Sequence, residues 1–162
     1  MIKHIEKQFK TIINKHKFIS PWGGWGRYSL SGYQGCEFQC IYCYARAEKY
    51  NKHFGDKNTI YVKKDAATML DLRIKRARTL EPDIVSIAGV CDPYQISELE
   101  FNNTRKCLEV LAKHRWPVNI WTKSAHVLPD IDLLSQIAKD TYASISFSIG
   151  TANDELAKYI ER

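Results

Sequence analysis

Short runs of apolar residues alternate with amphipathic stretches along most of this chain. An almost unbroken run of apolar residues at 83–90 is typical of a strand that is buried on both faces. Apolar runs at 118–123 and 142–150 predict two further strands, and residues 28–34 predict a short strand before a cysteine-rich loop. The first 20 residues show neither pattern, so we expect an N-terminal arm or irregular segment at 1–20.

Amphipathic patterns predict helices after the strands. The first covers residues 44–51, and the second begins after Asp65, a residue type that favours the N-cap position. A third covers residues 104–114, and Asp130 and Asn153 are expected to cap the last two. The positions expected to face the core are Ala66, Leu70, Ile74 and Ala77, then Cys107, Leu108 and Leu111, then Ile131, Leu134, Ile137 and Ala138, and finally Leu156, Ala157 and Ile160.

Strand and helix thus alternate four times, which predicts an α/β fold with a parallel sheet and crossover helices. Ligands of such folds bind at the carboxyl ends of the strands. The side chains at these ends are polar or reactive: the cysteine loop follows Gln34, Cys91 and Asp92 follow the second strand, Lys123 ends the third, and Ser148 lies on the fourth. The sequence therefore predicts one site at this edge of the sheet.

Composition and charge narrow the class of protein only slightly. The chain has 162 residues, a formal charge of +6 and a sequence pI near 9.0. A basic balance favours anionic partners such as nucleic acid, but the basic residues are spread out, as on a solvated face. There is no membrane-spanning apolar run and no signal-peptide core, so we expect a cytoplasmic protein without a membrane partner. Disulfides are rare in that compartment, so clustered cysteines there more often bind metal or carry out chemistry.

Three cysteines, Cys36, Cys40 and Cys43, stand within one stretch of eight residues. Thiolates prefer zinc, copper or iron–sulfur clusters, and a structural zinc site needs four ligands. His53 is a candidate fourth ligand, although a predicted helix separates it from the triplet, and Cys91 is remote in sequence. A four-iron cluster bound by three cysteines keeps one iron without a protein ligand, and a small molecule can chelate that iron.

The stretch "CEFQCIYC" has the form Cys-x3-Cys-x2-Cys with Tyr42 before the last cysteine, and it resembles the signature of the radical S-adenosylmethionine (SAM) enzymes. "GCEFQCIYCYAR", "GVCDPYQ", "TRKCLEVL", "PVNIWTKS" and "DIDLLSQIA" further resemble the subgroup that contains spore photoproduct lyase and its photolyase-like relatives. These motifs run from about residue 20 to the end of the chain. The resemblance implies a radical SAM core domain at 21–162 with the fold of a partial (β/α) barrel.

The resemblance also implies a mechanism and two cofactors. The three cysteines would bind a [4Fe–4S] cluster, and SAM would chelate its open iron. An electron from an external donor of the flavodoxin or ferredoxin kind would then cleave SAM to methionine and a 5′-deoxyadenosyl radical. By family position, Lys123 and Ser148 contact SAM, Cys91 and Asp92 lie near its amino acid part, and Tyr42 packs near the adenine or the cluster. No residue is assigned a catalytic role.

Two departures from the subgroup leave the substrate open. Spore photoproduct lyase has a hydrogen-donating cysteine where this chain has Gly89, so repair of thymine dimers is not implied. Radical SAM domains commonly have six βα units, whereas this sequence predicts about four. We therefore expect an incomplete barrel that a second chain or a missing C-terminal part completes, and a nucleic-acid substrate has only weak support.

The residues also permit other interpretations. The same cysteines and basic residues fit a zinc-stabilised nucleic-acid-binding module, and the short chain fits an inactive, truncated relative that binds a cluster. Asp92 before Pro93 can simply start a turn, and Lys123 can simply be solvated. The aromatic residues with the right chemistry to stack on a base are Trp22, Trp25 and Tyr94.

Overall fold

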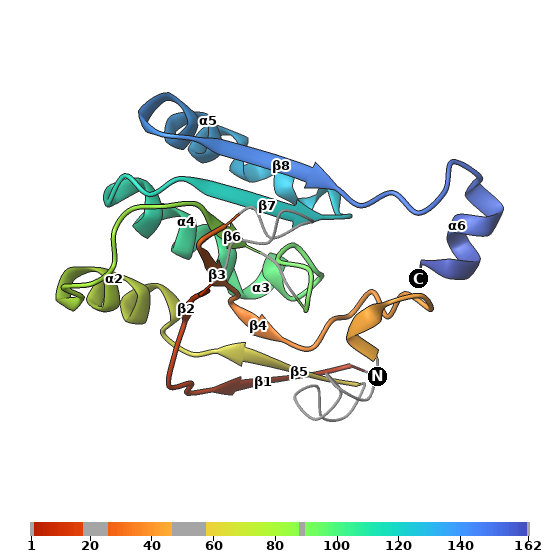
Figure 1. Ribbon diagram of the computed structural model, residues 1–162. Coiled ribbons are helices and arrows are strands. Elements are labelled where there is room, and N and C mark those ends of the chain that lie inside the picture. The colour runs from red at the N-terminus through yellow and green to blue at the C-terminus, as the bar shows by residue number, and fades with distance from the viewer. Residues whose placement is uncertain (1, 18–25, 47–57, 88–89, 162) are drawn as a thin grey trace.

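The structure is a computed structural model that describes residues 2–17, 26–46, 58–87 and 90–161. Its strands form a five-stranded and a three-stranded sheet, and Figure 1 shows the chain passing from one to the other. No described helix is long and apolar enough to cross a membrane. The features of the sequence that lie outside the described residues are Trp22, Trp25, the greater part of the predicted helix at 44–51, His53 and Gly89.

The five-stranded sheet has the order β2-β3-β6-β7-β8. Strands β3 (Tyr28–Leu30), β6 (Val85–Ile87), β7 (Val118–Thr122) and β8 (Ala143–Phe147) pair in parallel, which confirms the predicted parallel arrangement. Strand β2 (Ile13–Lys15) pairs antiparallel with β3 and forms one edge, and β8 forms the other.

The three-stranded sheet has β5 (Thr59–Lys63) in its centre. Strand β1 (Lys3–Lys7) pairs with it in parallel, and β4 (Tyr33–Gln34) pairs with it antiparallel. The expectation of irregular structure in the first 20 residues is therefore wrong for β1 and β2. Every residue of β1 is exposed, so its sequence shows no alternation of buried apolar and exposed polar residues. Its hydrogen-bonded pairing with β5, rather than burial of side chains, stabilises the strand.

The single strand predicted at 28–34 is two strands, β3 and β4, in different sheets. The chain changes sheet at Gly32, where a Cβ atom would come within 2.8 Å of the Asn103 Cβ. The Gly32 carbonyl accepts a hydrogen bond from the Lys63 N–H at 2.9 Å, which joins the crossing point to the end of β5. A close backbone approach that only glycine permits thus redirects the strand.

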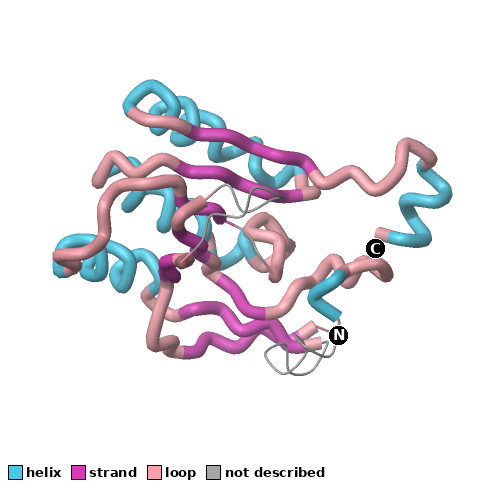
Figure 2. Tube along the Cα trace, viewed as in Figure 1, coloured by secondary structure: helices cyan, strands magenta, loops and turns pink. Residues whose placement is uncertain are grey.

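Three longer helices pack on one face of the five-stranded sheet. They are α2 (Ala66–Arg76), α4 (Asn103–Lys113) and α5 (Ile131–Asp140), and the shorter segments are α3 (Glu98–Phe101), α6 (Asp154–Ile160) and the 3-10 segments η1 (Tyr44–Arg46) and η2 (Ala125–Asp130). Leu30, Ile87 and Ile120 lie opposite one another in the ladder, so they share a face. They belong to the same core as the buried apolar side chains of these helices, and Figure 2 shows the helices together beside the strands. Ile131 and Ala138 of α5, which were expected to face this core, are exposed instead.

The predicted helix starts agree with the structure, but the capping hydrogen bonds agree only in part. Asp65 and Asp130 precede α2 and α5 without a side-chain cap hydrogen bond. Asn153 does cap α6, because its side chain accepts from the Leu156 N–H at 2.9 Å. No residue of α6 is buried, so the prediction that it turns Leu156, Ala157 and Ile160 into a core is wrong.

Candidate cofactor site

The cysteine loop begins where β4 ends. Gly35 has φ +98°, and a Cβ there would lie 2.9 Å from the Thr59 carbonyl oxygen, so glycine is needed for the turn out of the strand. Cys40 is buried, whereas Cys36 and Cys43 are partly buried, and all three are free thiols. The Cys43 N–H donates to the Cys40 carbonyl at 3.2 Å, which closes a turn between these two cysteines.

The donor chemistry of the loop fits an iron–sulfur cluster. Three free thiols on one short loop are the ligand type that such clusters take. No three His, Cys, Asp or Glu side chains in the described part of the chain are arranged to hold a single metal ion. A cluster takes its thiolates on separate irons, so its ligands need not converge on one point. Burial raises the pKa of the Cys36 thiol, while the backbone N–H groups of Asp92 and Phe38 act in the opposite direction.

A buried polar network that the sequence did not predict holds the start of this loop. The Glu37 carboxylate accepts from the His4 ring at 2.6 Å and from the Ser97 N–H at 3.2 Å. The Glu37 N–H donates to the Gln95 side chain at 2.9 Å, and the Gln95 amide donates to the Gly35 carbonyl at 3.4 Å. Strand β1 and the segment that follows β6 therefore fix the loop on both sides of Cys36.

Cys91 lies beneath the cysteine loop. It is buried with Tyr33, Ile60 and Val62 in a small apolar cluster, and Cys36 packs against this cluster. The Ser31 hydroxyl lies 3.0 Å from the Cys91 sulfur. Burial raises the pKa of Cys91 to about 12, so this side chain is a neutral thiol at physiological pH.

Asp92 joins the ends of two parallel strands. Its carboxylate accepts from the Thr122 hydroxyl at 2.6 Å, from the Lys123 N–H at 2.9 Å and from the Tyr94 N–H at 2.9 Å. The bond to Tyr94 is the local turn that an Asp before Pro favours. A carboxylate has about four lone-pair positions, so three of them are used within the protein. The described structure thus gives Asp92 a positioning role at the end of β6 and β7.

Lys123 and Tyr42, two of the predicted cofactor-binding residues, are in contact. The Lys123 ammonium donates to the Tyr42 hydroxyl at 2.8 Å and lies 5.3 Å from the centre of its ring. Glu161 completes the cluster, since its carboxylate pairs with Lys123 at 2.7 Å and accepts from the Tyr42 hydroxyl. Glu161 was not anticipated from the sequence, which holds no local pattern linking it to Lys123. Figure 1 shows α6 and the C-terminal end beside the loop that follows β4.

Ser148 does not join this cluster. It lies just beyond β8 rather than on it, and its side chain is exposed. Its N–H donates to the Thr122 carbonyl at 2.9 Å, which continues the pairing of β7 and β8. Within the described ranges, no hydrogen bond joins the Ser148 hydroxyl to Lys123, Tyr42 or Asp92, so its contact with SAM stays a prediction.

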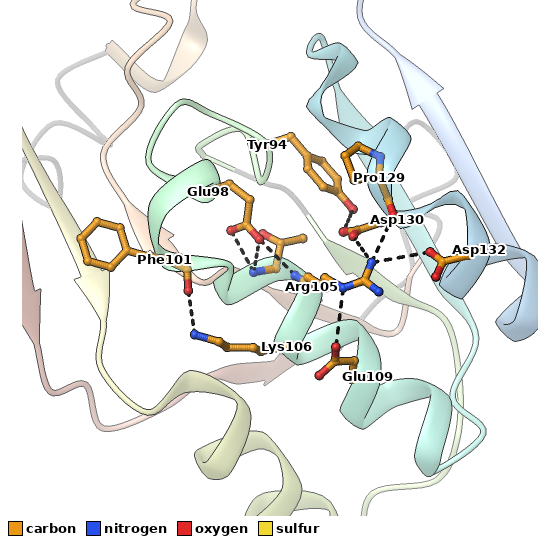
Figure 3. Close-up of polar contacts among 10 residues, drawn as sticks. Tyr94, Glu98, Phe101, Arg105, Lys106, Glu109, Pro129, Asp130 and Asp132 are labelled. Atoms are coloured by element: carbon orange, nitrogen blue, oxygen red, sulfur yellow. Dashed lines mark hydrogen bonds and ion pairs between the residues drawn. The ribbon is translucent and has the colours of Figure 1, made fainter.

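Tyr94 is part of the core and is not a surface for stacking. Only 1% of it is exposed, and its hydroxyl donates to Asp130 at 2.9 Å. Arg105 donates to the same carboxylate at 2.6 Å, as Figure 3 shows. Nearby, Glu98 accepts the N–H groups of Thr104 and Arg105 at the start of α4. This network fixes the segment behind the candidate site, and it corrects the expectation that Tyr94 stacks on a base.

The chain is similar to curated proteins that are themselves uncharacterized. It is 27% identical over 139 residues to the uncharacterized protein Rv2578c of Mycobacterium tuberculosis, covering 83% of this chain and 41% of that protein. It is 27% identical over 136 residues to the uncharacterized protein MJ0683 of Methanocaldococcus jannaschii, covering 83% of this chain and 49% of that protein. The chain thus spans less than half the length of these relatives. No family model matches it.

Solved structures of spore photoproduct lyase share the fold. A mutant of that enzyme superposes with a TM-score of 0.66 at 20% identity, covering 98% of this chain and 42% of that chain. A complex with dinucleoside spore photoproduct gives a TM-score of 0.65 at 20% identity, and a mutant with bound AdoMet and dinucleoside spore photoproduct gives 0.63 at 18%. The described fold is therefore that of the corresponding part of spore photoproduct lyase.

Proposed function

We propose that the chain is a radical SAM protein, or the N-terminal part of one, of the photolyase-like kind. The observation that carries this proposal is the set of three free thiols on the loop after β4, in a chain with the fold of spore photoproduct lyase over nearly its whole length. One of those lyase structures holds AdoMet, the cofactor that the cysteine pattern implies. We take residues 21–162 to be the radical SAM core and its parallel strands to be part of a (β/α) barrel.

In this proposal Cys36, Cys40 and Cys43 bind a [4Fe–4S] cluster as thiolates. When bound and reduced by an external donor, the cluster supplies one electron for the cleavage of SAM. The residues of the chain bind and orient: Lys123 pairs with the SAM carboxylate, and Tyr42 packs beside it. Cys91 and Asp92 border the site at the end of β6, where Asp92 keeps Lys123 in place through its backbone.

We propose a nucleic acid as the substrate class, and a similar solved structure supports this. That structure is named as a complex with dinucleoside spore photoproduct, a molecule built from two nucleosides. The formal charge of +6 is compatible with such a partner. Because the chain covers only 42% of that enzyme, we propose that further polypeptide, in the same chain or a second one, completes the substrate site.

The test is anaerobic reconstitution with iron and sulfide, followed by a SAM-cleavage assay with a strong reductant. We expect a brown, oxygen-sensitive protein with about four irons per chain that releases 5′-deoxyadenosine. Cys36→Ala should lose both iron and nucleoside release. Cys107→Ala is the matched control, because Cys107 is a fully buried core thiol on α4 and should retain both. A colourless protein that takes up only zinc would contradict the proposal and favour the zinc module.

A further inference from the structure

A carboxylate already sits between the two side chains that we propose for SAM. The Glu161 carboxylate pairs with the Lys123 ammonium at 2.7 Å and accepts a hydrogen bond from Tyr42. The Lys123 and Glu161 side chains are only 16% and 21% exposed, so this is a largely buried ion pair. Tyr42 and Lys123 thus form a carboxylate-binding site with two donors that converge on one oxygen of Glu161.

Backbone contacts place Glu161 at this position. The Ile41 N–H, which lies in the cysteine loop, donates to the Ile160 carbonyl at 3.1 Å. Gly150 lies beside the carboxylate, and a Cβ there would come within 2.8 Å of Glu161 Oε1 and 3.2 Å of the Tyr42 hydroxyl oxygen. Glycine leaves room for the carboxylate in this position, and a methyl group at residue 150 would push it aside. The segment from Gly150 to Glu161, which contains α6, brings the end of the described chain back to the cysteine loop.

Helix α6, which ends just before Glu161, is not otherwise anchored in a core. No residue of α6 is buried, and Leu156 and Tyr159 are 47% and 68% exposed. The contacts of Ile160 and Glu161 with the cysteine loop are therefore a main attachment of this segment. A segment with little buried apolar area can be displaced at a modest cost in free energy.

We propose that Glu161 occupies the carboxylate position of the cofactor in the free chain, and that the carboxylate of SAM displaces it. The identity of this ligand rests on the proposed function. One ammonium cannot pair equally well with two carboxylates at the same place, because the second anion is repelled by the first. Glu161 therefore competes with SAM, and binding of SAM releases residues 150–161 from the cysteine loop.

The experiment measures the affinity for SAM of the unmodified chain and of its variants by equilibrium dialysis. Each protein is loaded with the cluster and kept oxidised, so that SAM is not turned over. The apparent dissociation constant equals the intrinsic one divided by the fraction of molecules with a free site, so a site that is free in about one molecule in ten gives a tenfold effect. We expect Glu161→Gln to bind SAM about tenfold more tightly than the unmodified chain. Gly150→Ala should act in the same direction, because its added methyl group displaces the Glu161 carboxylate.

Glu155→Gln is the matched control. Glu155 lies on α6 and pairs with Lys158 at 2.9 Å, and both side chains are exposed. This variant removes one acidic group from the helix that precedes Glu161 without touching the cysteine loop, so its SAM affinity should not change. Hydrogen exchange at the Ile41 amide gives a second measurement. The amide should exchange faster in Glu161→Gln, and faster in the unmodified chain once SAM is added.

The outcomes separate this inference from the proposed function. Equal SAM affinity of Glu161→Gln and the unmodified chain would overturn the displacement and leave the proposed function standing. Tighter binding without faster exchange at Ile41 would also overturn it, because the segment would then not be released. A loaded cluster without SAM binding in any variant would refute both.

Discussion

Glu37 offers a direct test of how the cysteine loop is held in place. Its side chain is only 2% exposed and accepts from the His4 ring and from the backbone of Ser97, which is itself 1% exposed. In Glu37→Ala the Ser97 N–H is left buried without its acceptor, while the His4 ring is 26% exposed and can turn to water. An unsatisfied buried donor costs about 1–3 kcal/mol. Adding the partial loss at His4, we expect a destabilisation of about 2–4 kcal/mol.

The assay is thermal unfolding of the unloaded chain. For a chain of this length each kcal/mol lowers Tm by about 2–4 °C, so Glu37→Ala should unfold about 5–15 °C lower. A double-mutant cycle with His4→Ala isolates the pair, and His4→Ala should cost less in the Glu37→Ala background. Glu100→Ala is the control: that carboxylate is 3.8 Å from His4 and 69% exposed, so its removal should change Tm little.

The same variant should also weaken metal binding, since Glu37 lies between Cys36 and Cys40. We expect reconstituted Glu37→Ala to lose iron on dialysis faster than the unmodified chain. Glu37→Gln keeps an acceptor for the Ser97 N–H, so its rate of iron loss should lie between those of the unmodified chain and Glu37→Ala. An unchanged Tm in Glu37→Ala would show that the network does not hold the loop, and the reasoning from buried hydrogen bonds would fail at this site.

Two further predictions concern groups with perturbed pKa values. Hydrogen bonds from Lys75, His114 and Lys113 lower the pKa of Asp71, so the ionised carboxylate stabilises the fold above its unfolded pKa of about 3.9, and this stabilisation is lost as pH falls below that value. The Tm difference between the unmodified chain and Asp71→Asn should therefore be present at pH 7 and shrink below pH 4. An equal Tm difference at both pH values would contradict this. Burial raises the pKa of Cys91 to about 12, so iodoacetamide at pH 8 should alkylate this thiol far more slowly in the folded chain than in the unfolded chain. Mass mapping of the alkylated sites measures the two labelling rates. Equally fast labelling in the folded chain would contradict the burial of Cys91.

The parallel core could be predicted from the sequence because most of its strands and helices bury apolar side chains, although no residue of β8 or of the helix α6 that follows it is buried. β6 and β7 lie in the interior of the sheet, so most of their residues are buried and their sequences are rich in Val and Ile. Strand β1 gave no such signal, since its residues are exposed and its pairing with β5 is a long-range event. The break at Gly32 was equally invisible, because it depends on contact with Asn103, a residue far away in the chain.

The candidate site also combines residues that stand out in the sequence with residues whose role is visible only in the fold. Cys36, Cys40 and Cys43 stand out in the sequence as candidate ligands because their thiols are concentrated in one loop. Glu37 and Glu161 could not, because the partners that give them a role are 33 or more residues away. A carboxylate in a loop or near a helix end reads as an ordinary solvated charge until the fold supplies a cation or a buried N–H.

Asp92 explains why the ends of β6 and β7 are joined to each other rather than forming separate loops. The last N–H groups of a parallel strand have no partner once the neighbouring strand ends, so they need an acceptor from elsewhere. Asp92, placed after β6, supplies it to the Lys123 N–H and to the Thr122 hydroxyl at the end of β7. Those bonds fix the backbone from which the Lys123 side chain reaches Tyr42 on the cysteine loop. The position of the ammonium therefore depends on a carboxylate that never touches it, because the strand from which Lys123 projects is held by Asp92.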